Sequence, residues 1–329
     1  MRVLAATDKF RGTLTAADAA AAVCRGVTRA GGTATAVPLA DGGEGTLEVL
    51  GGGNRHTTVM GPLGDPVEAW WRLERRTAVI EMAQASGLTL VGGPEGNDPI
   101  AATTHGTGEL IAAALDGGAT RILVGMGGSA TTDGGLGAIR SLWNPGRLRS
   151  IELIAACDVR TRFVDAAEVF APQKGASAAQ VRLLGRRLER LAQVYLADYG
   201  VDVLAVVGGG AAGGLAGGLH VVGASLVSGF DVVADEVELA EQMEAVDLVI
   251  TGEGFVDAQS FEGKVVGGVV AMAAEIGVDV LVVAGEVFDD TPPDVAAISL
   301  VERFGRERAL TEAASCIEEA VAERLSPSS

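Results

Sequence analysis

Charged side chains directly follow the first apolar run of the sequence. Residues 3–6 are apolar and predict a short strand, and the charged residues after it are Asp8, Lys9 and Arg11. Ligands of open parallel sheets bind outside the carboxyl ends of the strands. A carboxylate beside two cations is therefore well placed to act on a ligand. A surface turn with a solvated ion pair would explain the same pattern.

A second acidic segment occupies the equivalent place after another apolar run. Asp41 and Glu44 lie in the sequence Asp-Gly-Gly-Glu-Gly, just beyond residues 35–39. Mg²⁺ takes hard oxygen ligands and keeps several waters, so two carboxylates spaced by glycines suit it. Alternatively, Asp41 caps a helix and Glu44 completes a capping box. Both interpretations stay open at this point.

Glycine-rich segments follow apolar runs at 125–135 and 208–214 and, less clearly, at 104–109. A glycine turn that opens a helix presents unpaired N–H groups and the positive end of the helix dipole, which favour anions. Tight packing without a ligand is the alternative for any one of them. Asp133 could take a metal or a proton. The residues expected to bind the cofactor through these turns are Gly127, Gly128, Ser129, Thr131, Gly210, Ala211 and Gly213.

Lysine is rare in this sequence and always lies near a glycine. The chain has 25 lysines and arginines together, of which only Lys9, Lys174 and Lys264 are lysines. A compact ammonium group is a good point-charge partner for a phosphate. The three lysines are therefore candidates for binding an anion, with chance as the alternative for so small a sample.

The order of the predicted elements indicates the fold class. Thr15 is a good N-cap for a helix that runs to about Arg29, and helices are expected at about 264–277 and 309–324. The largely apolar runs 203–207, 247–251, 278–283 and 297–301 predict strands. Continuous apolar strands that alternate with helices are typical of a parallel, doubly wound α/β sheet.

The middle of the chain departs from this alternation, because residues 67–73 and 77–82 predict a hairpin. We therefore expect a discontinuous Rossmann- or flavodoxin-like α/β domain of residues 1–62 plus 246–329. A second α/β domain, residues 63–245, would be inserted into it. The ligand site is expected in a cleft between the two domains.

Composition excludes several classes of protein. The formal charge of −18 without a basic run argues against a nucleic-acid partner. Apolar residues make up 48% of the chain, yet no apolar run is long enough to suggest a membrane span. The three cysteines lie far apart and the N-terminus is unlike a signal peptide, which predicts a cytoplasmic protein. The histidines are scattered as well, so a zinc site is not expected. A homodimer is one alternative for the assembly.

The charged and glycine-rich segments together resemble the bacterial-type glycerate kinase family. The resemblance spans almost the whole chain in order, and its most specific motifs are "ADGGEG", "GGSATTDGG" and "TGEGxxDxQ". The other matching stretches are residues 8–13, "GPLGDPVEA", "VIEMAQASGL", "TTHGTGEL", "ACDV", "APQKGA" and "GGGAAGGL".

This resemblance implies a two-domain α/β kinase that transfers the γ-phosphoryl group of ATP, with Mg²⁺, to a hydroxyl of D-glycerate, most often at C2. Phosphoryl transfer needs positioning, neutralised charge and a group that orients the nucleophile. We assign the orienting role to Asp8 or Asp257. The cations expected to offset substrate charge are Arg11, Lys174 and Lys264, and the candidate metal ligands are Asp41, Glu44, Asp133 and Glu253.

The sequence departs from the family pattern in several places. It has Phe255 where an arginine is usual and Arg11 where a lysine is usual, and it is shorter between Gly137 and Ile151. The loop after Asp158 is also shorter. The loss of a cation at position 255 would remove a carboxylate or phosphate contact. The departures therefore leave open which hydroxy acid is the substrate.

Two other functions compete with a kinase. The sequence Gly208-x-Gly210-x-x-Gly213 after an apolar run is compatible with a dinucleotide-binding oxidoreductase. That fingerprint needs an acidic residue at the end of the next strand, whereas Asp231, at about the right distance, is predicted to open a helix. A catalytically degenerate anion-binding relative of the kinases is the second alternative.

Overall fold

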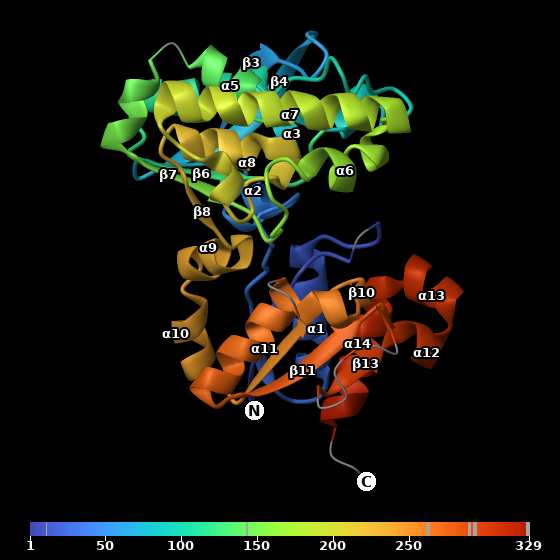
Figure 1. Cartoon of the computed structure of the whole chain (residues 1–329). Helices are drawn as coiled ribbons and strands as arrows, with labels where there is room; N and C mark the ends of the chain where they lie inside the picture. Colours follow the sequence, from blue (N-terminus) through green and yellow to red (C-terminus); the bar gives the residue numbers. More distant parts are fainter. Residues whose placement is uncertain (11, 143, 262–263, 289–290, 292–294, 327–329) are drawn as a thin grey trace. The chain divides into compact units, whose positions relative to one another are not determined.

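The computed structural model describes residues 1–329 except 11, 143, 262–263, 289–290, 292–294 and 327–329. The chain forms two compact units, Met1–Asp41 with Phe230–Ser329 and Gly42–Gly229, here called the first and second units (Figure 1). The prediction from sequence puts the joins at residues 62/63 and 245/246. The first join differs because the strand at Arg55–Met60 pairs within the second unit's sheet.

The first unit is built on a five-stranded parallel sheet with the order β13-β11-β9-β1-β2. The chain leaves β1 for β2 on one side and later returns to the other side of β1 as β9. The strand order therefore reverses at β1, which is where such sheets bind ligands. The strands are β1 Arg2–Thr7, β2 Thr33–Ala36, β9 Leu248–Gly252, β11 Asp279–Ala284 and β13 Ala297–Ser299, with a two-stranded extension of β10 Phe255–Val256 and β12 Glu286–Val287.

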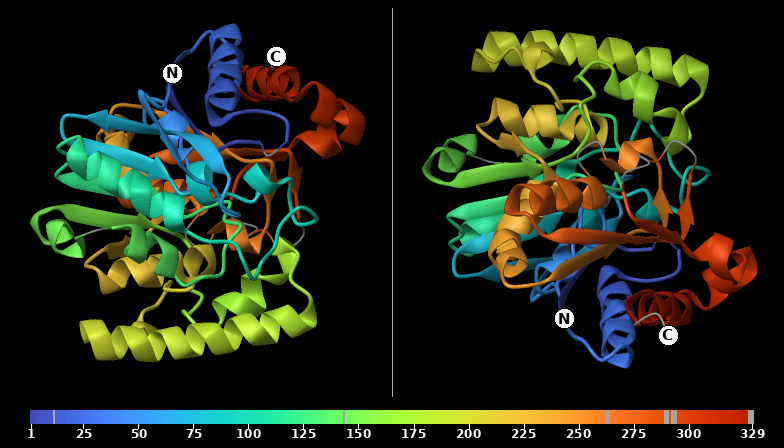
Figure 2. Two further views of the ribbon diagram at one scale, coloured as in Figure 1. Left: turned by 90° about the horizontal axis from the view of Figure 1, so that it is seen from above. Right: turned by 90° about the horizontal axis from the view of Figure 1, so that it is seen from below.

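Helices cover both faces of this sheet. Helices α1 and α14 lie side by side over one face (Figure 2), where they bury Val3 and Ala5 of β1. Helix α11 lies against the other face and buries Val266 with Val282. Thr15 caps α1 by accepting the Asp18 N–H, as expected. The helices are α1 Ala16–Arg29, α9 Gly229–Glu236, α10 Leu239–Glu244, η5 Ala258–Phe261, α11 Val265–Ile276, α12 Leu300–Phe304, α13 Arg306–Thr311 and α14 Ala313–Leu325.

The second unit has a six-stranded mixed sheet with the order β3-β4-β5-β6-β7-β8. Strands β3, β4 and β5 are antiparallel neighbours, which confirms the predicted hairpin, and β5 to β8 are parallel. The α/β class predicted from sequence is therefore confirmed in both units. The strands are β3 Arg55–Met60, β4 Pro66–Glu74, β5 Thr77–Glu81, β6 Arg121–Gly125, β7 Glu152–Ala156 and β8 Ser225–Val227.

A large hydrophobic core joins this sheet to its helices. The long helix α7 is the outer layer, and α8 lies beneath it (Figure 1). Ser177 and Gln180 form a capping box at the start of α7. The helices are α2 Thr46–Val49, α3 Ala83–Ser86, η1 Thr89–Val91, α4 His105–Asp116, α5 Leu136–Ser141, η2 Pro145–Ser150, α6 Ala166–Phe170, η3 Pro172–Lys174, α7 Ala178–Tyr199, η4 Val203–Ala205 and α8 Ala211–Val221.

One predicted strand is wrong. The apolar run 203–207 begins as the short helix η4 because the Asp202 carboxylate accepts the Leu204 N–H and turns the chain. Residues 297–301 are also split, since β13 ends at Ser299, whose hydroxyl caps α12 by accepting the Glu302 N–H. In both places a short polar side chain bonds to nearby backbone and ends the extended conformation.

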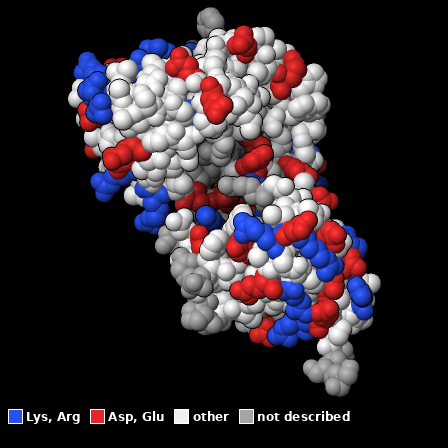
Figure 3. Space-filling model, turned by 90° about the vertical axis from the view of Figure 1, so that its right-hand side faces the viewer, with Lys and Arg blue, Asp and Glu red and all other residues white. Residues whose placement is uncertain are grey.

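The surface carries acidic and basic side chains intermixed, as the face in Figure 3 shows. Many of them pair; Arg308, for example, contacts both Glu312 and Glu319. All three cysteines are free, and Cys316 is fully buried. Within the described part of the chain, none of the helices is both long and apolar enough to span a bilayer.

Candidate active site

Asp8 lies at the carboxyl end of β1, at the point where the strand order of the first unit reverses. Its backbone N–H donates to the Gly252 carbonyl of β9 at 2.9 Å, which continues the β1–β9 pairing by one residue. Its carboxylate accepts the Lys9 N–H at 2.7 Å. The residue is only 7% exposed. The sheet therefore holds a nearly buried carboxylate at the position where ligands of such folds bind.

The surroundings of Asp8 favour its protonated form. Burial, followed by the nearby carboxylate of Asp41, raises the pKa of Asp8 from 3.8 to about 7. The Lys9 N–H and charge act in the opposite direction, and Glu253 adds to the rise. Carboxylates from different parts of the chain therefore lie near enough to Asp8 for their charges to act on its protonation.

Glu253 follows β9 directly and is the second acidic residue of this cluster. Burial raises the pKa of Glu253, with further increases from Asp41 and Asp257, while a Ser260 hydrogen bond and the Lys264 charge oppose the rise. Its Oε1 atom is buried and has no hydrogen-bond partner in the described part of the chain. A buried carboxylate oxygen without a donor is ready to accept a metal ion or a ligand proton.

Asp257 and Lys264 complete the first unit's set of predicted residues. Asp257 accepts the Ser260 N–H at 3.0 Å and so anchors the turn that begins η5. Lys264 is the half-buried N-cap residue of α11, and its charge acts on Glu253. The structure thus brings together Asp8, Asp41, Glu253, Asp257 and Lys264, all predicted from sequence.

The carboxylates of this cluster suit a Mg²⁺ site whose remaining ligands come from a substrate. Among the described residues, no three Asp, Glu, His or Cys side chains are arranged to hold a metal by themselves. Mg²⁺ sites in phosphoryl-transfer enzymes usually use one or two carboxylates plus phosphate oxygens and water. The unpartnered Oε1 of Glu253, close to the charge of Asp41, fits that kind of site.

Asp133, predicted as a metal ligand, lies in the second unit and is saturated with hydrogen bonds. Its carboxylate accepts the N–H of Thr104 at 2.9 Å and the Thr104 hydroxyl at 2.9 Å. The N–H groups of Gly135 and Gly137 donate to it at 3.1 Å each. These bonds join the start of α4 to the start of α5, which is a structural task.

Lys174 is also held inside the second unit. Its Nζ donates to the Ser129 hydroxyl at 2.7 Å and to the Thr131 carbonyl at 2.6 Å, and the side chain is buried. Burial lowers the pKa of Lys174 to about 7, against a smaller opposing effect of Asp133. The ammonium group therefore fastens the 129–131 loop to η3 and uses two of its three donors in doing so.

The predicted phosphate-binding glycines divide into two groups. Gly210, Ala211 and Gly213 are fully buried, and a Cβ on Gly213 would come within 1.9 Å of the Thr131 carbonyl oxygen. Close packing of α8 on the 131–135 loop therefore accounts for Gly213 without a ligand. Gly127 is half-buried and Gly128 is exposed with φ +72°, directly beyond β6.

Glu44 and Arg11 are the remaining predicted residues. Glu44 is exposed in the turn before α2, and Arg11 lies outside the described residues. Sequence reasoning missed Glu81, a buried residue whose Oε1 accepts the N–H groups of Gly45 and Leu47 at 2.9 and 2.8 Å. It thereby positions the turn that carries Glu44. The signal was an acidic residue that ends the apolar run 78–80.

The structure does not place the glycine pattern of the dinucleotide-binding alternative between a strand and a helix. The Gly208–Gly213 pattern follows the short helix η4 rather than a strand, and α8 starts with left-handed residues at 212–214. Asp231 lies in the first turn of α9 instead of ending a strand. A similar spacing, Gly125-x-Gly127-x-x-Ala130, does follow β6, but the next helix, α5, begins only at Leu136. A Rossmann fingerprint needs a strand before the glycines and a helix directly after them.

Comparison with known proteins gives a consistent result. The model of the glycerate kinase family matches residues 3–143 and 144–326. The chain is 39% identical to the glycerate 2-kinase of Escherichia coli K12, over 88% of this chain and 86% of that protein. It is also 39% identical to the glycerate kinase of Bacillus subtilis 168, with the same coverage of both chains.

A solved structure is similar over nearly the whole length. A crystal structure from Salmonella typhimurium LT2, which bears the name glycerate kinase 2, superimposes with a TM-score of 0.84. It is 34% identical in sequence, and the match covers 99% of this chain and 97% of that one. On this agreement of sequence and fold, the chain belongs to the glycerate kinase family.

Proposed function

We propose that this protein transfers the γ-phosphoryl group of ATP to the C2 hydroxyl of D-glycerate. The observation that carries the proposal is the cluster of Asp8, Asp41 and Glu253, with Lys264 beside it, at the strand-order reversal of the first unit. Family membership supports ATP as the donor and glycerate as the acceptor. The protein would act in the cytoplasm, which its three free cysteines suit.

Asp8 would orient the attacking hydroxyl. Its carboxylate accepts the hydrogen bond of the substrate hydroxyl and takes the proton as the new O–P bond forms and the bond between the β- and γ-phosphates breaks. The products are phosphoglycerate and ADP. Asp8 suits this role better than Asp257 because it is more buried and because one Asp257 oxygen already holds the Ser260 turn.

The remaining groups would handle charge. Asp41 and Glu253 would hold Mg²⁺, which neutralises phosphate charge when it is bound. Lys264 would contact a phosphate or the glycerate carboxylate as a point charge. As a separate proposal within the second unit, the backbone N–H groups of Gly127 and Gly128 would bind an anion, since this turn is the more exposed of that unit's two glycine-rich turns.

Phosphorus NMR of a reaction mixture tests the proposal directly. The purified protein is incubated with ATP, MgCl₂ and one hydroxy acid at a time, including D-glycerate, L-glycerate, glycolate and D-lactate. We expect ADP and 2-phosphoglycerate from D-glycerate. Formation of 3-phosphoglycerate would correct the position. Absence of any phosphorylated acid, with ATP still stabilising the protein, would instead favour a degenerate relative.

Substitution of Glu253 by glutamine should weaken Mg²⁺ binding. The change removes a charged ligand oxygen, a contact worth about 1.5–3 kcal/mol, so the Mg²⁺ concentration for half-maximal activity should rise roughly 10- to 100-fold. Melting curves with increasing MgCl₂ provide a readout that is independent of turnover. Glu275→Gln, an exposed position on α11, is the matched control. An unchanged Mg²⁺ dependence in Glu253→Gln would remove Glu253 from the metal site.

A further inference from the structure

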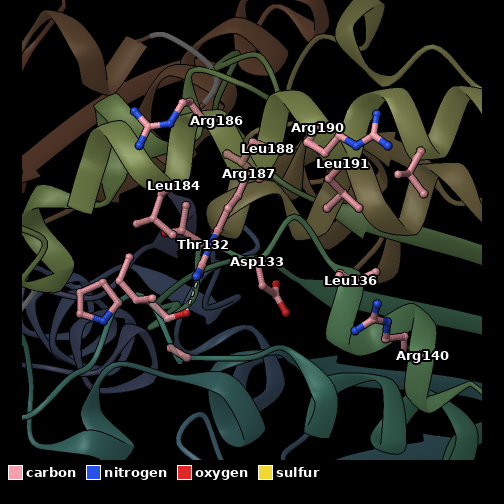
Figure 4. Close-up of a pocket in the computed structure, with 14 residues that line it drawn as sticks. Thr132, Asp133, Leu136, Arg140, Leu184, Arg186, Arg187, Leu188, Arg190 and Leu191 are labelled. Carbon is pink, nitrogen blue, oxygen red and sulfur yellow. Dashed lines mark hydrogen bonds between the residues drawn. The ribbon is translucent and has the colours of Figure 1, made fainter. Parts of the chain in front are cut away.

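A pocket of about 530 Å³ lies entirely within the second unit. Helix α7 contributes Leu184, Leu188 and Leu191 to it, and α5 contributes Leu136 on another side (Figure 4). Pro99, Ile100 and Ala102 form another part of the wall. All of these elements belong to one unit, so the pocket is a property of that unit alone. It contains none of the residues of the Asp8 cluster.

Four arginines surround this apolar pocket, namely Arg140, Arg186, Arg187 and Arg190. None of the four makes an ion pair with a carboxylate in the part of the chain that the structure describes. Arg187 donates to the Ile100 carbonyl at 2.9 Å and Arg190 donates to Gln193 at 2.8 Å, both neutral acceptors. Elsewhere on the surface, arginines such as Arg303 and Arg308 pair with glutamates.

The inner wall of the pocket adds an unused polar atom. Thr132 is 1% exposed, and its hydroxyl has no hydrogen-bond partner among the described residues. Asp133 also lines the pocket, but its carboxylate is saturated by Thr104 and the N–H groups of Gly135 and Gly137. Asp133 therefore offers little additional hydrogen bonding to a ligand, whereas the Thr132 hydroxyl is available.

We propose that this pocket binds a small organic anion with an apolar body, of the arylalkyl carboxylate class. The leucines of α7 would contact the hydrocarbon part, and Arg140 with Arg190 would pair with the carboxylate. The negative net charge of the chain makes this group of arginines informative. A chain of formal charge −18 places four arginines, none of them in an ion pair with another described residue, around one apolar pocket, which is the complement of an amphipathic anion.

Calorimetric titration with 4-phenylbutyrate tests this site in the full-length protein. We expect one bound molecule per chain and binding at least about tenfold weaker for the neutral amide 4-phenylbutyramide. Arg140→Gln and Arg190→Gln should each weaken the carboxylate roughly 10- to 100-fold, the loss expected for one charge-assisted contact. Arg182→Gln is the matched control, since Arg182 is an exposed residue of the same helix that does not line the pocket.

Several results would overturn the proposal. These are no binding at millimolar 4-phenylbutyrate, equal binding of acid and amide, or equal loss of affinity in Arg182→Gln. Displacement of the probe by Mg-ATP or D-glycerate in simple competition would place it in the substrate site. Light scattering is run in parallel, because a dimer that dissociates in Arg140→Gln and Arg190→Gln would make a second copy of the chain the occupant.

Discussion

Replacement of Asp8 by asparagine should lower kcat for D-glycerate by about 10²- to 10⁴-fold, the range for loss of a general base. The amide has nearly the same shape as the carboxylate, but it cannot take the proton of the attacking hydroxyl. The amide oxygen can still accept a hydrogen bond from the substrate, so KM should change much less than kcat. A coupled assay of ADP release measures both constants.

Asp279→Asn is the control for this substitution. Asp279 begins β11 at the amino end of the same sheet and is exposed. It should leave kcat within about twofold of the original, as expected for a surface position away from the site. A kcat for Asp8→Asn within tenfold of the unsubstituted enzyme would remove Asp8 as the base and transfer the role to Asp257.

The same substitution should stabilise the protein at neutral pH. The pKa of Asp8 is about 7 in the folded protein and 3.8 ordinarily, so between these values the folded state binds more protons than the unfolded state. Stability is therefore lost as the pH rises from about 4 to about 7. At about 1.4 kcal/mol per pKa unit, the loss is at most roughly 4 kcal/mol.

Urea unfolding of Asp8→Asn and the original protein at pH 5 and pH 8, with EDTA present, checks this expectation. The variant should gain stability relative to the original as the pH increases. The difference between the two proteins isolates Asp8 from Lys174, whose pKa is lowered and whose contribution has the opposite slope above pH 7. A variant that is less stable at pH 8 would show that the Asp8 carboxylate is stabilised by its surroundings instead.

Local rules of sequence were sufficient for the parts of the fold that position Asp8 and Glu253. The runs 3–6 and 247–251 predicted β1 and β9, and Asp8 and Glu253 directly follow the carboxyl ends of those strands. Helix α1 begins after the Thr15 cap and ends at Arg29, as expected. These features depend on neighbouring residues only, so periodicity and capping chemistry suffice.

Features that depend on distant residues could not be predicted in this way. Asp133 was chosen as a metal ligand and Lys174 as a cation for substrate charge, but their partners Thr104 and Ser129 are set by tertiary packing. The role of the glycines in residues 208–214 could not be decided from sequence either. A glycine that binds phosphate and a glycine that allows two backbones to touch look alike in sequence.

Gly213→Ala distinguishes these two roles of glycine and should be among the most destabilising single substitutions in the protein. A Cβ at this position would lie 1.9 Å from the Thr131 carbonyl oxygen, and φ is +68°. The overlap is with backbone, so α8 or the 131–135 loop must move. We expect a loss of more than about 3 kcal/mol in the free energy of unfolding.

Gly185→Ala is the control, because Gly185 lies in the interior of α7 with no atom within 4 Å of the added Cβ. This substitution should instead increase the free energy of unfolding by about 0.5–1 kcal/mol. Urea unfolding measures both changes. If Gly213→Ala keeps its stability and only the KM for ATP rises, Gly213 binds the nucleotide and the packing explanation is wrong.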